Sequence, residues 1–392
     1  MREGPHSLLV YLGLAAANAK GMQDLIMQGA AGFSQEQLTE MIRGIQRYQN
    51  HGHHQERLKT QKIWQDGTVK ILKPDGESSS VAESQSAPLL LIPSLINKAY
   101  ILDLAQERSF LRWLNANGVP SYLLDWGDLV VERKENVSLS MAQLIRNKMC
   151  KAIEVLADQH ECPIDVLGYC MGGTLLAGGM HIVRKSVRKA VFLATPWDFH
   201  TSELDVNAEQ EKSTAPEEHQ ELAEMVRNWA PVVTPIIEKK GYLPKENTQN
   251  LFAALGARSA VQKFVRFVSM DDSAPGTRLF VSAEDWLNDG VDLPGRIAHE
   301  CIQNWFLDNA PAEGVWYVDD HRINPARFDL PCLVIAARKD SLVPFSNAHA
   351  LYDQIPQDHR HIIAPNIGHV GLIVGGNAVE EVWRPLHQWL CE

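Results

Sequence analysis

Short runs of apolar residues alternate with longer amphipathic stretches over most of the chain. The runs predict buried strands, because consecutive apolar residues leave a strand no polar face, and the amphipathic stretches predict helices. The predicted strands are Val69 to Leu72, Leu89 to Ile92, Ser121 to Leu124, Ile164 to Leu167, Ala190 to Leu193, Leu333 to Ala336 and His361 to Ala364. Strands that alternate with helices favour a mostly parallel, doubly wound sheet with helices on both faces, so we predict an α/β fold.

Two stretches depart from this alternation. Residues 1–60 show helical patterns, including a helix predicted from Gln35 to Tyr48, and we expect them to form an N-terminal helical appendage. Strands are scarce between residues 201 and 326, so we predict a cap inserted between two strands of the sheet. Its acidic run from Ser202 to Glu224 is interpreted as a solvated face. The two predicted parts of the core are residues 61–200 and 327–392.

Composition narrows the class of protein. Of the 392 residues 45% are hydrophobic and 22% charged, which is typical of a soluble globular protein. A net charge of -11 should repel nucleic acid phosphates, so we expect no nucleic acid partner. The six cysteines show no CxxC pair and no zinc-ligand spacing, which fits a reducing compartment. No apolar run approaches the roughly 20 residues of a membrane span, so we expect no transmembrane segment.

The segment from Ser7 to Ala19 allows two interpretations. Arg2 precedes a short apolar run that ends in Ala17-Asn18-Ala19, a pattern similar to a signal peptide with its cleavage site. The helical pattern nevertheless continues unbroken through Leu25 and Ile26, which favours an amphipathic helix lying on the domain. We therefore predict a cytoplasmic protein, with secretion as the alternative.

A cysteine stands in the sequence context of a catalytic nucleophile. Gly168-Tyr169-Cys170-Met171-Gly172-Gly173 follows a predicted strand and precedes the helical stretch Thr174 to Val183. This is the context of the G-x-S-x-G nucleophile elbow, with Cys170 in place of serine. The following helix would point its N–H groups at the thiol and stabilise the thiolate. We predict that Cys170 is the nucleophile of an α/β-hydrolase fold; an inert cysteine buried in a glycine turn is the alternative.

An acid and a base follow in the order that such an elbow requires. Asp340 lies on the loop after the predicted strand Leu333 to Ala336, and His369 lies on a glycine-flanked loop after the last strand. The chain order nucleophile, acid, base is that of the α/β hydrolases. For the oxyanion hole we predict the backbone N–H groups of Met171 and Ile96, each worth about 3 kcal/mol of transition-state stabilisation.

Several segments resemble polyhydroxyalkanoate synthases. Leu95 to Leu104 is similar to the family's I-N-K-x-Y-I-L-D-L segment, and Gly168 to Leu175 is similar to its cysteine box. Asp125-Trp126-Gly127 resembles a segment of the short-chain classes, and Trp286 to Gly295 is a variant of the family's cap motif. The likeness, of a class III type, spans about residues 60–390. It departs from the family at Ser341, where synthases carry a histidine, in the altered cap motif, and in lacking the large amino-terminal domain of the long synthases.

The resemblance implies an acyltransferase. It would move 3-hydroxyacyl groups from coenzyme A to Cys170 and on to a growing polyester, with His369 as base and Asp340 holding its tautomer. Cysteine suits this chemistry because exchange of one thioester for another is close to thermoneutral and keeps the acyl group activated. Coenzyme A thioester would be a substrate, and no cofactor is expected. The resemblance further implies a partner subunit or a homodimer, and association with polyester granules.

Two other functions stay open at this point. The same triad with water as acceptor would make a hydrolase, either a thioesterase or a polyester depolymerase. A non-catalytic relative would bind granules through Leu8 to Leu14 and cap residues. His51-Gly52-His53-His54 has no carboxylate or cysteine partner at ligand spacing, so we expect no metal site. His299 is expected to be a solvated helix histidine rather than a substrate contact.

Overall fold

The computed structural model describes residues 2, 4–5, 35–76, 86–130, 139–201, 220–255 and 257–392. The predicted helix at Ser7 to Ala19, the segment Leu8 to Leu14 and the acidic run up to residue 219 lie outside these residues. The chain forms two compact units, Met1–Arg57 with Pro244–Gly290 and Leu58–Leu243 with Val291–Glu392. The division of the chain at residues 60, 200 and 326 stays a prediction.

A large sheet forms the centre of the second unit. Its strands, in spatial order, are β1 (Thr60–Asp66), β2 (Val69–Pro74), β4 (Ser121–Asp125), β3 (Leu89–Ile92), β5 (Ile164–Tyr169), β6 (Val187–Leu193), β11 (Cys332–Ile335) and β12 (Arg360–Ile363). Pairing is antiparallel from β1 to β2 and from β2 to β4, and parallel from β4 through β12. This mostly parallel sheet, with a sharp turn into a helix after β5, is that of the α/β-hydrolase fold.

Each of the seven predicted strands is confirmed within a few residues, and β1 was missed. Among the described strands, β1 pairs with β2 alone, and each of its residues is exposed or half-buried. An edge strand of this kind needs no continuous apolar run, so the pattern used for the buried strands passes over it. The central strands show the opposite character, because every residue of β3, β5 and β11 is buried.

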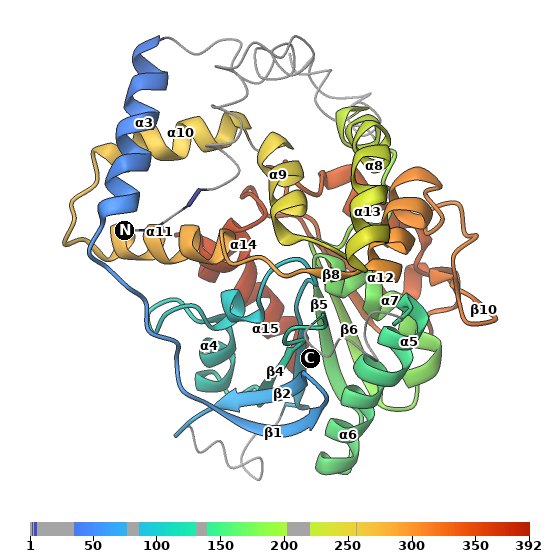
Figure 1. Cartoon of the computed structure of the whole chain (residues 1–392). Helices are drawn as coiled ribbons and strands as arrows, with labels where there is room; N and C mark the ends of the chain where they lie inside the picture. The colour runs from blue at the N-terminus through green and yellow to red at the C-terminus, as the bar shows by residue number, and fades with distance from the viewer. Residues whose placement is uncertain are drawn as a thin grey trace. The chain divides into compact units, whose positions relative to one another are not determined.

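Helices cover both faces of the sheet. Figure 1 shows α4 (Phe110–Ala116) and α15 (Arg384–Cys391) on one side of the strands, and α6 (Lys151–His160) and α7 (Met171–Val183) on the other. The other helical segments here are η2 (Ala99–Asp103), α5 (Met141–Gln143), η3 (Leu144–Cys150), α8 (Gln220–Lys240), α12 (Gly295–Glu300), η5 (Cys301–Leu307), η6 (Pro325–Arg327), α13 (Phe345–Gln354), η7 (Gln357–His359), α14 (Gly371–Val374) and η8 (Val379–Trp383). Two small ribbons pair β7 (Tyr242–Leu243) with β8 (Leu293–Pro294), and β9 (Tyr317–Val318) with β10 (His321–Arg322).

The insertion predicted between two sheet strands lies between β6 and β11 and is mainly helical in its described part. Its middle stretch, residues 244–290, is grouped with the N-terminal segment in the first unit. This grouping could not be read from the strand pattern, because it depends on contacts between residues far apart in the chain.

The first unit is a small helical body. Its helices are α3 (Gln35–Asn50), α9 (Lys245–Leu255), α10 (Ala257–Val268) and α11 (Pro275–Leu287), so the helix predicted from Gln35 is confirmed. Tyr48 of α3 packs with Phe264 and Phe267 of α10 in its apolar core. Arg47 lies over the Phe267 ring at 4.8 Å and donates to the Val268 carbonyl at 2.8 Å. A cation at the carboxyl end of a helix stabilises its last carbonyl groups.

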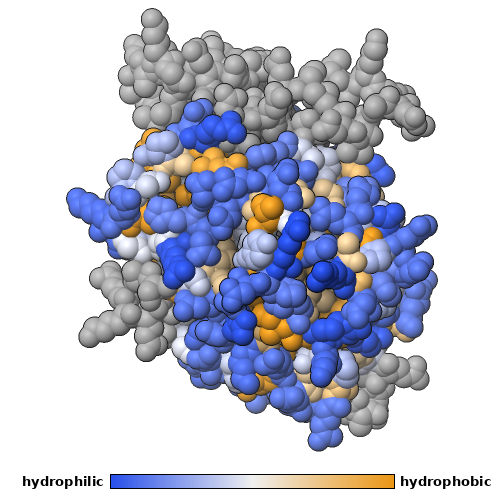
Figure 2. Space-filling view, turned by 90° about the vertical axis from the view of Figure 1, so that its right-hand side faces the viewer, coloured by the Kyte–Doolittle hydropathy of each residue, from blue (hydrophilic) through white to orange (hydrophobic). Residues whose placement is uncertain are grey.

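Figure 2 shows the hydropathy of one face, coloured for the described residues. Hydrophilic residues prevail there, and hydrophobic residues form small separate patches. Within the described ranges, no helix is long and apolar enough to cross a membrane.

Candidate active site

Cys170 lies at a sharp turn between β5 and α7. Its backbone has φ 54° and ψ -128°, a conformation that costs a non-glycine residue about 1–3 kcal/mol and is typical of functional sites. Neighbouring glycines make the turn possible: a side chain at Gly172 would collide with the carbonyl of Pro93, and one at Gly173 with the Thr195 hydroxyl. The nucleophile elbow predicted from the glycine pattern is therefore present in its expected place.

Hydrogen bonds fix this turn on the sheet. The Cys170 N–H donates to the carbonyl of Leu193 at the end of β6, at 2.9 Å, and the Gly173 N–H donates to the Cys170 carbonyl at the same distance. Cys170 itself is only 5% exposed. Cys170 directly precedes α7, which begins at Met171, so the residue stands at the N-terminal end of that helix.

Asp340 and His369 form a tight pair. The Asp340 side chain is 2% exposed, and its Oδ2 lies 2.7 Å from His369 Nδ1. The other carboxylate oxygen accepts the backbone N–H groups of Leu342 at 2.9 Å and Val343 at 2.8 Å. Three hydrogen bonds thus fix the carboxylate, and the ring nitrogen that faces it must carry the proton.

His369 lies between this carboxylate and the thiol. Burial disfavours its charged form, but the Asp340 charge, the Cys170 charge and hydrogen bonds to both side chains outweigh burial and raise the pKa of His369 to about 10. Asp340 occupies Nδ1, which leaves Nε2 for Cys170. The structure thus joins His369 to Asp340 by a hydrogen bond and places Cys170 close enough to raise the pKa of the same ring. The roles of the three residues as nucleophile, acid and base stay a prediction.

The two predicted oxyanion donors, Met171 and Ile96, lie at the start of α7 and on the loop after β3. Met171 is the first residue of α7, where N–H groups have no acceptor within the helix. The Ile96 N–H lies 3.5 Å from Ser94 Oγ, a long and weak contact, while the Ile96 carbonyl accepts the Val291 N–H at 3.1 Å. Val291 belongs to the cap motif, so this motif holds the loop that follows β3. The oxyanion assignment itself stays a prediction.

Trp126 supports the same loop, a role that the sequence pattern does not indicate. Its indole N–H donates to the Pro93 carbonyl at 3.0 Å, and the side chain is 4% exposed. Gly127 beside it has φ 64°, and a side chain there would collide with the Thr68 backbone. The Asp125-Trp126-Gly127 segment therefore positions the backbone of the loop that runs from β3 past the elbow.

We expect Trp126→Phe to lower kcat/KM about 5-fold with little change in folding, because phenylalanine keeps most of the packing and loses one net hydrogen bond. Steady-state assays with an acyl thioester measure the effect. Trp113→Phe is the matched control, since Trp113 packs on Trp383 and His387 rather than on this loop. Equal activities of the wild type and Trp126→Phe would show that the bond to Pro93 has no functional weight.

His51, His53 and His299, which the sequence singles out, have other surroundings in the structure. His53 Nε2 lies 3.1 Å from Ser282 Oγ, and His51 Nε2 lies 3.5 Å from Asp272 in the first unit. Among the described residues, no group of three or more His, Cys, Asp or Glu side chains could hold a metal ion. His299 lies on α12, where it lines an open hollow with Glu238 and Arg296.

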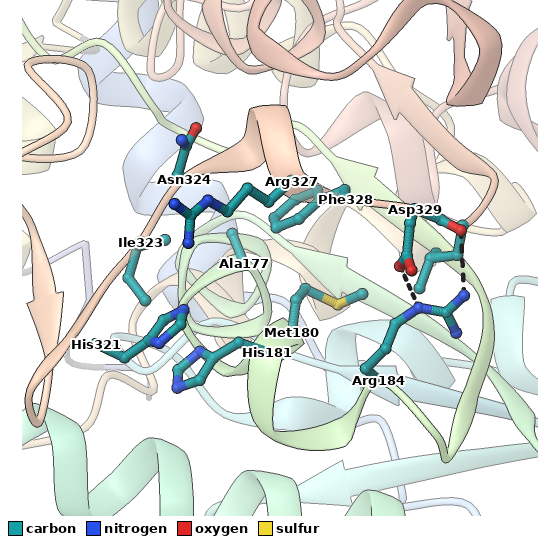
Figure 3. A pocket seen from close by; sticks show the side chains of 11 residues that line it. Ala177, Met180, His181, Arg184, His321, Ile323, Asn324, Arg327, Phe328 and Asp329 are labelled. Carbon is teal, nitrogen blue, oxygen red and sulfur yellow. Dashed lines mark hydrogen bonds and ion pairs between the residues drawn. The ribbon is translucent and has the colours of Figure 1, made fainter.

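A separate hollow of about 190 Å³ lies along the second half of α7 (Figure 3). His181 and His321 stack there with ring centroids 3.8 Å apart, and Arg184 is paired with Asp329. At 1.5 Å per residue along the helix, its residues on α7 lie roughly 10 to 20 Å from Cys170. This hollow is therefore distinct from the candidate active site.

The N-terminal part of the chain matches the model of a known protein family. The family model described as Poly-beta-hydroxybutyrate polymerase (PhaC) N-terminus matches residues 33–114. The match begins before residue 60, so the likeness extends further toward the N-terminus than the motifs indicated and includes α3.

Curated relatives match most of the chain. The poly(3-hydroxyalkanoate) polymerase subunit PhaC of Haloarcula marismortui is 24% identical over 84% of this chain and 67% of its own length. The subunit of the same name from Haloferax mediterranei is 23% identical, and this chain spans only 63% of it. The Allochromatium vinosum subunit is 26% identical over 82% of this chain and 84% of its own length.

Solved structures with a similar fold include a bromoperoxidase from Bacillus anthracis, 15% identical with a TM-score of 0.47, which covers 85% of this chain and 99% of that one. A thermophilic esterase from Thermogutta terrifontis is 14% identical with a TM-score of 0.42, and the match covers 86% of this chain and 98% of that one.

Proposed function

We propose, on the premise that this chain is a relative of the poly(3-hydroxyalkanoate) polymerases, that it is an acyltransferase that builds a polyester from 3-hydroxyacyl-CoA. The observation that carries the proposal is the buried pair of Asp340 and His369, joined at 2.7 Å, beside Cys170 on a strained elbow. A cysteine nucleophile with a buried histidine and aspartate suits acyl transfer between a thioester and an alcohol.

Acylation uses the imidazolium and the thiolate together. The Cys170 thiolate attacks the thioester carbonyl of the hydroxyacyl-CoA, and a new carbon–sulfur bond forms. The bond to the coenzyme A sulfur then breaks, and His369 gives its proton to that sulfur as the thiol leaves. We assign stabilisation of the oxyanion between these events to the N–H groups of Met171 and Ile96.

Chain extension reverses the direction of proton transfer. The hydroxyl of another hydroxyacyl unit attacks the acyl-Cys170 carbonyl, while neutral His369 accepts the hydroxyl proton. The carbon–sulfur bond breaks, an ester bond forms, and the thiolate returns opposite a protonated His369. Asp340 stays ionised throughout and stabilises the positive ring.

Burial favours an alcohol over water as the acceptor. Cys170 and Asp340 are at most 5% exposed, and His369 is 9% exposed. A site with so little open surface limits access of bulk water to the acyl-enzyme. A longer substrate that brings its hydroxyl with it can then be ordered against the thioester.

The relatives' names supply the partners that we propose. These relatives are called subunits, so we propose that this chain works with a partner subunit or as a homodimer. The same relationship supports a cytoplasmic protein that associates with the surface of the polyester as it grows. No cofactor enters the proposed reaction, because coenzyme A arrives as part of the substrate.

Product analysis tests this function against hydrolysis. We expect purified protein, alone and together with a co-expressed partner, to convert 3-hydroxybutyryl-CoA into chloroform-soluble polyester and free coenzyme A. Free 3-hydroxybutyrate as the main product would instead establish a thioesterase. Neither product under any condition would remove the enzymatic assignment.

A further inference from the structure

Tyr169 makes two separate contacts with His369. Its ring stacks on the imidazole with centroids 5.2 Å apart and planes inclined by 27°, and its hydroxyl donates to the His369 backbone carbonyl at 3.4 Å. Tyr169 is 2% exposed. It is the last residue of β5 and directly precedes Cys170. One residue of the central strand thus holds both the ring and the backbone of the base.

We propose that Tyr169 is a positioning residue that fixes the His369 ring plane and favours the protonated ring. The stack covers a face of the ring, whereas Asp340 binds the ring nitrogen Nδ1 at 2.7 Å. With both nitrogens engaged and the face covered, the imidazole cannot rotate away from the thiol. The importance of this positioning for catalysis rests on the proposed function.

The electrostatics of an aromatic face support the proposal that Tyr169 favours the protonated form of His369. The π-face carries negative charge density and attracts a cation within about 6 Å, most strongly where water is excluded. The charged groups that face His369 are Asp340 from the loop after β11 and Cys170 from the elbow. Tyr169 adds a neutral group from β5, because burial, and then the charges of Cys170 and Asp340, raise its phenol pKa well above the ordinary value. The hydroxyl therefore remains a hydrogen-bond donor.

The hydrogen bond from the Tyr169 hydroxyl to the His369 carbonyl links two distant elements of the sheet. His369 lies on the loop that follows β12, whereas Tyr169 belongs to β5, which is separated from β12 in the sheet by β6 and β11. A bond from the Tyr169 hydroxyl to the His369 carbonyl ties this loop to the strand that carries the nucleophile. The strand that precedes Cys170 therefore also positions the loop that carries His369.

Two substitutions separate the ring from the hydroxyl. Tyr169→Phe keeps the stack and loses the hydroxyl, while Tyr169→Leu loses both. We expect Tyr169→Leu to lower the pKa of His369 by about one unit and to move the basic limb of the kcat/KM profile down equally. Tyr169→Phe should leave the pKa within about 0.3 units of wild type, because the ring face is retained. Proton NMR of protein with ¹³C-labelled histidine measures the pKa without any substrate.

A second tyrosine–histidine pair provides the matched control. Tyr122 of β4 is also buried, its hydroxyl lies 2.9 Å from His160 Nε2, and the two rings are 5.4 Å apart. Tyr122→Leu should therefore destabilise the protein to a similar degree and leave the pKa of His369 unchanged. A fall in this pKa with Tyr122→Leu would show that the effect is general loosening of the fold.

Other outcomes also decide the matter. An unchanged His369 pKa in Tyr169→Leu, or an equal fall in Tyr169→Phe, would overturn the positioning role. If the leucine variant does not fold, Tyr169→Met removes the ring while its flexible chain fills the space, and the same shift is expected. Because the NMR pKa needs no turnover, a shifted pKa in a protein that makes no polyester would refute the proposed function and leave the role of Tyr169 intact.

Discussion

Asp340→Asn is expected to lower turnover about 10⁴-fold in a folded protein. An asparagine oxygen can still accept the N–H groups of Leu342 and Val343, so the loop keeps its shape. The amide NH₂ would then face His369 Nδ1, which must become an acceptor and place its only proton on the nitrogen that faces Cys170. In that tautomer the ring cannot take the proton of a thiol or a substrate hydroxyl.

The same substitution should lower the pKa of His369. The Asp340 charge is the largest influence that raises this pKa from 6.5 to about 10, against the opposing effect of burial. Removal of the charge leaves burial opposed by Cys170 alone, so the basic limb of the kcat/KM profile moves to lower pH. Rapid-quench acylation and NMR titration measure the two effects.

Asp103→Asn is a suitable control for the loss of a buried carboxylate. Asp103 accepts from Ser109 Oγ at 2.6 Å and Arg112 Nε at 3.0 Å, and belongs to the segment that resembles I-N-K-x-Y-I-L-D-L. Its loss should lower the melting temperature and leave kcat unchanged. Near-wild-type turnover of Asp340→Asn, beside this control, would remove Asp340 from the triad.

The parts of the site that the sequence predicts are those with local signals. Cys170 stands between glycines after a buried strand, and Asp340 and His369 follow later strands in a fixed order. Each of these signals needs only a few neighbouring residues and the general topology of the fold. The structure brings these side chains together because the carboxyl ends of parallel strands meet at one edge of the sheet.

The supporting contacts could not be predicted in this way. The Trp126 bond to Pro93 joins residues 33 positions apart, and the Tyr169 bond to His369 joins residues 200 positions apart. Trp126 stands in a segment that only the resemblance singles out, and Tyr169 stands beside the nucleophile in the elbow, but the sequence does not show where an indole or a phenol points. The strand β1 could not be predicted for another reason, because a half-exposed edge strand needs no continuous run of apolar residues.

Cys170→Ala is expected to abolish acylation and polyester synthesis and to leave the melting temperature within a few degrees of wild type. Alanine is smaller than cysteine and enters a turn whose backbone conformation a non-glycine residue already adopts. Cys332→Ala on β11 is the matched control, since that cysteine is also buried but lies outside the candidate active site. This control should keep its turnover, with some loss of stability from the small cavity.

Cys170→Ser tests whether the reaction needs a thiol or only a nucleophile at this position. Serine restores the hydrolase form of the elbow, but an alcohol has a far higher pKa than a thiol, and its oxygen ester is a poorer acyl donor to another hydroxyl. We expect slow hydrolysis of activated esters at best and no polyester. Full polyester synthesis by the serine variant would contradict the thioester mechanism.

The most direct test of the account is to locate the acyl group after a brief reaction with radiolabelled 3-hydroxybutyryl-CoA. Five other thiols compete for the label. Burial raises the pKa of Cys150 and Cys332 to about 12 and raises that of Cys301 as well, whereas Cys162 and Cys391 are exposed. We predict a hydroxylamine-sensitive thioester on the peptide that contains Gly168 to Gly173 and on no other peptide. A label on any of the other cysteines, with Cys170 unmodified, would contradict the central claim.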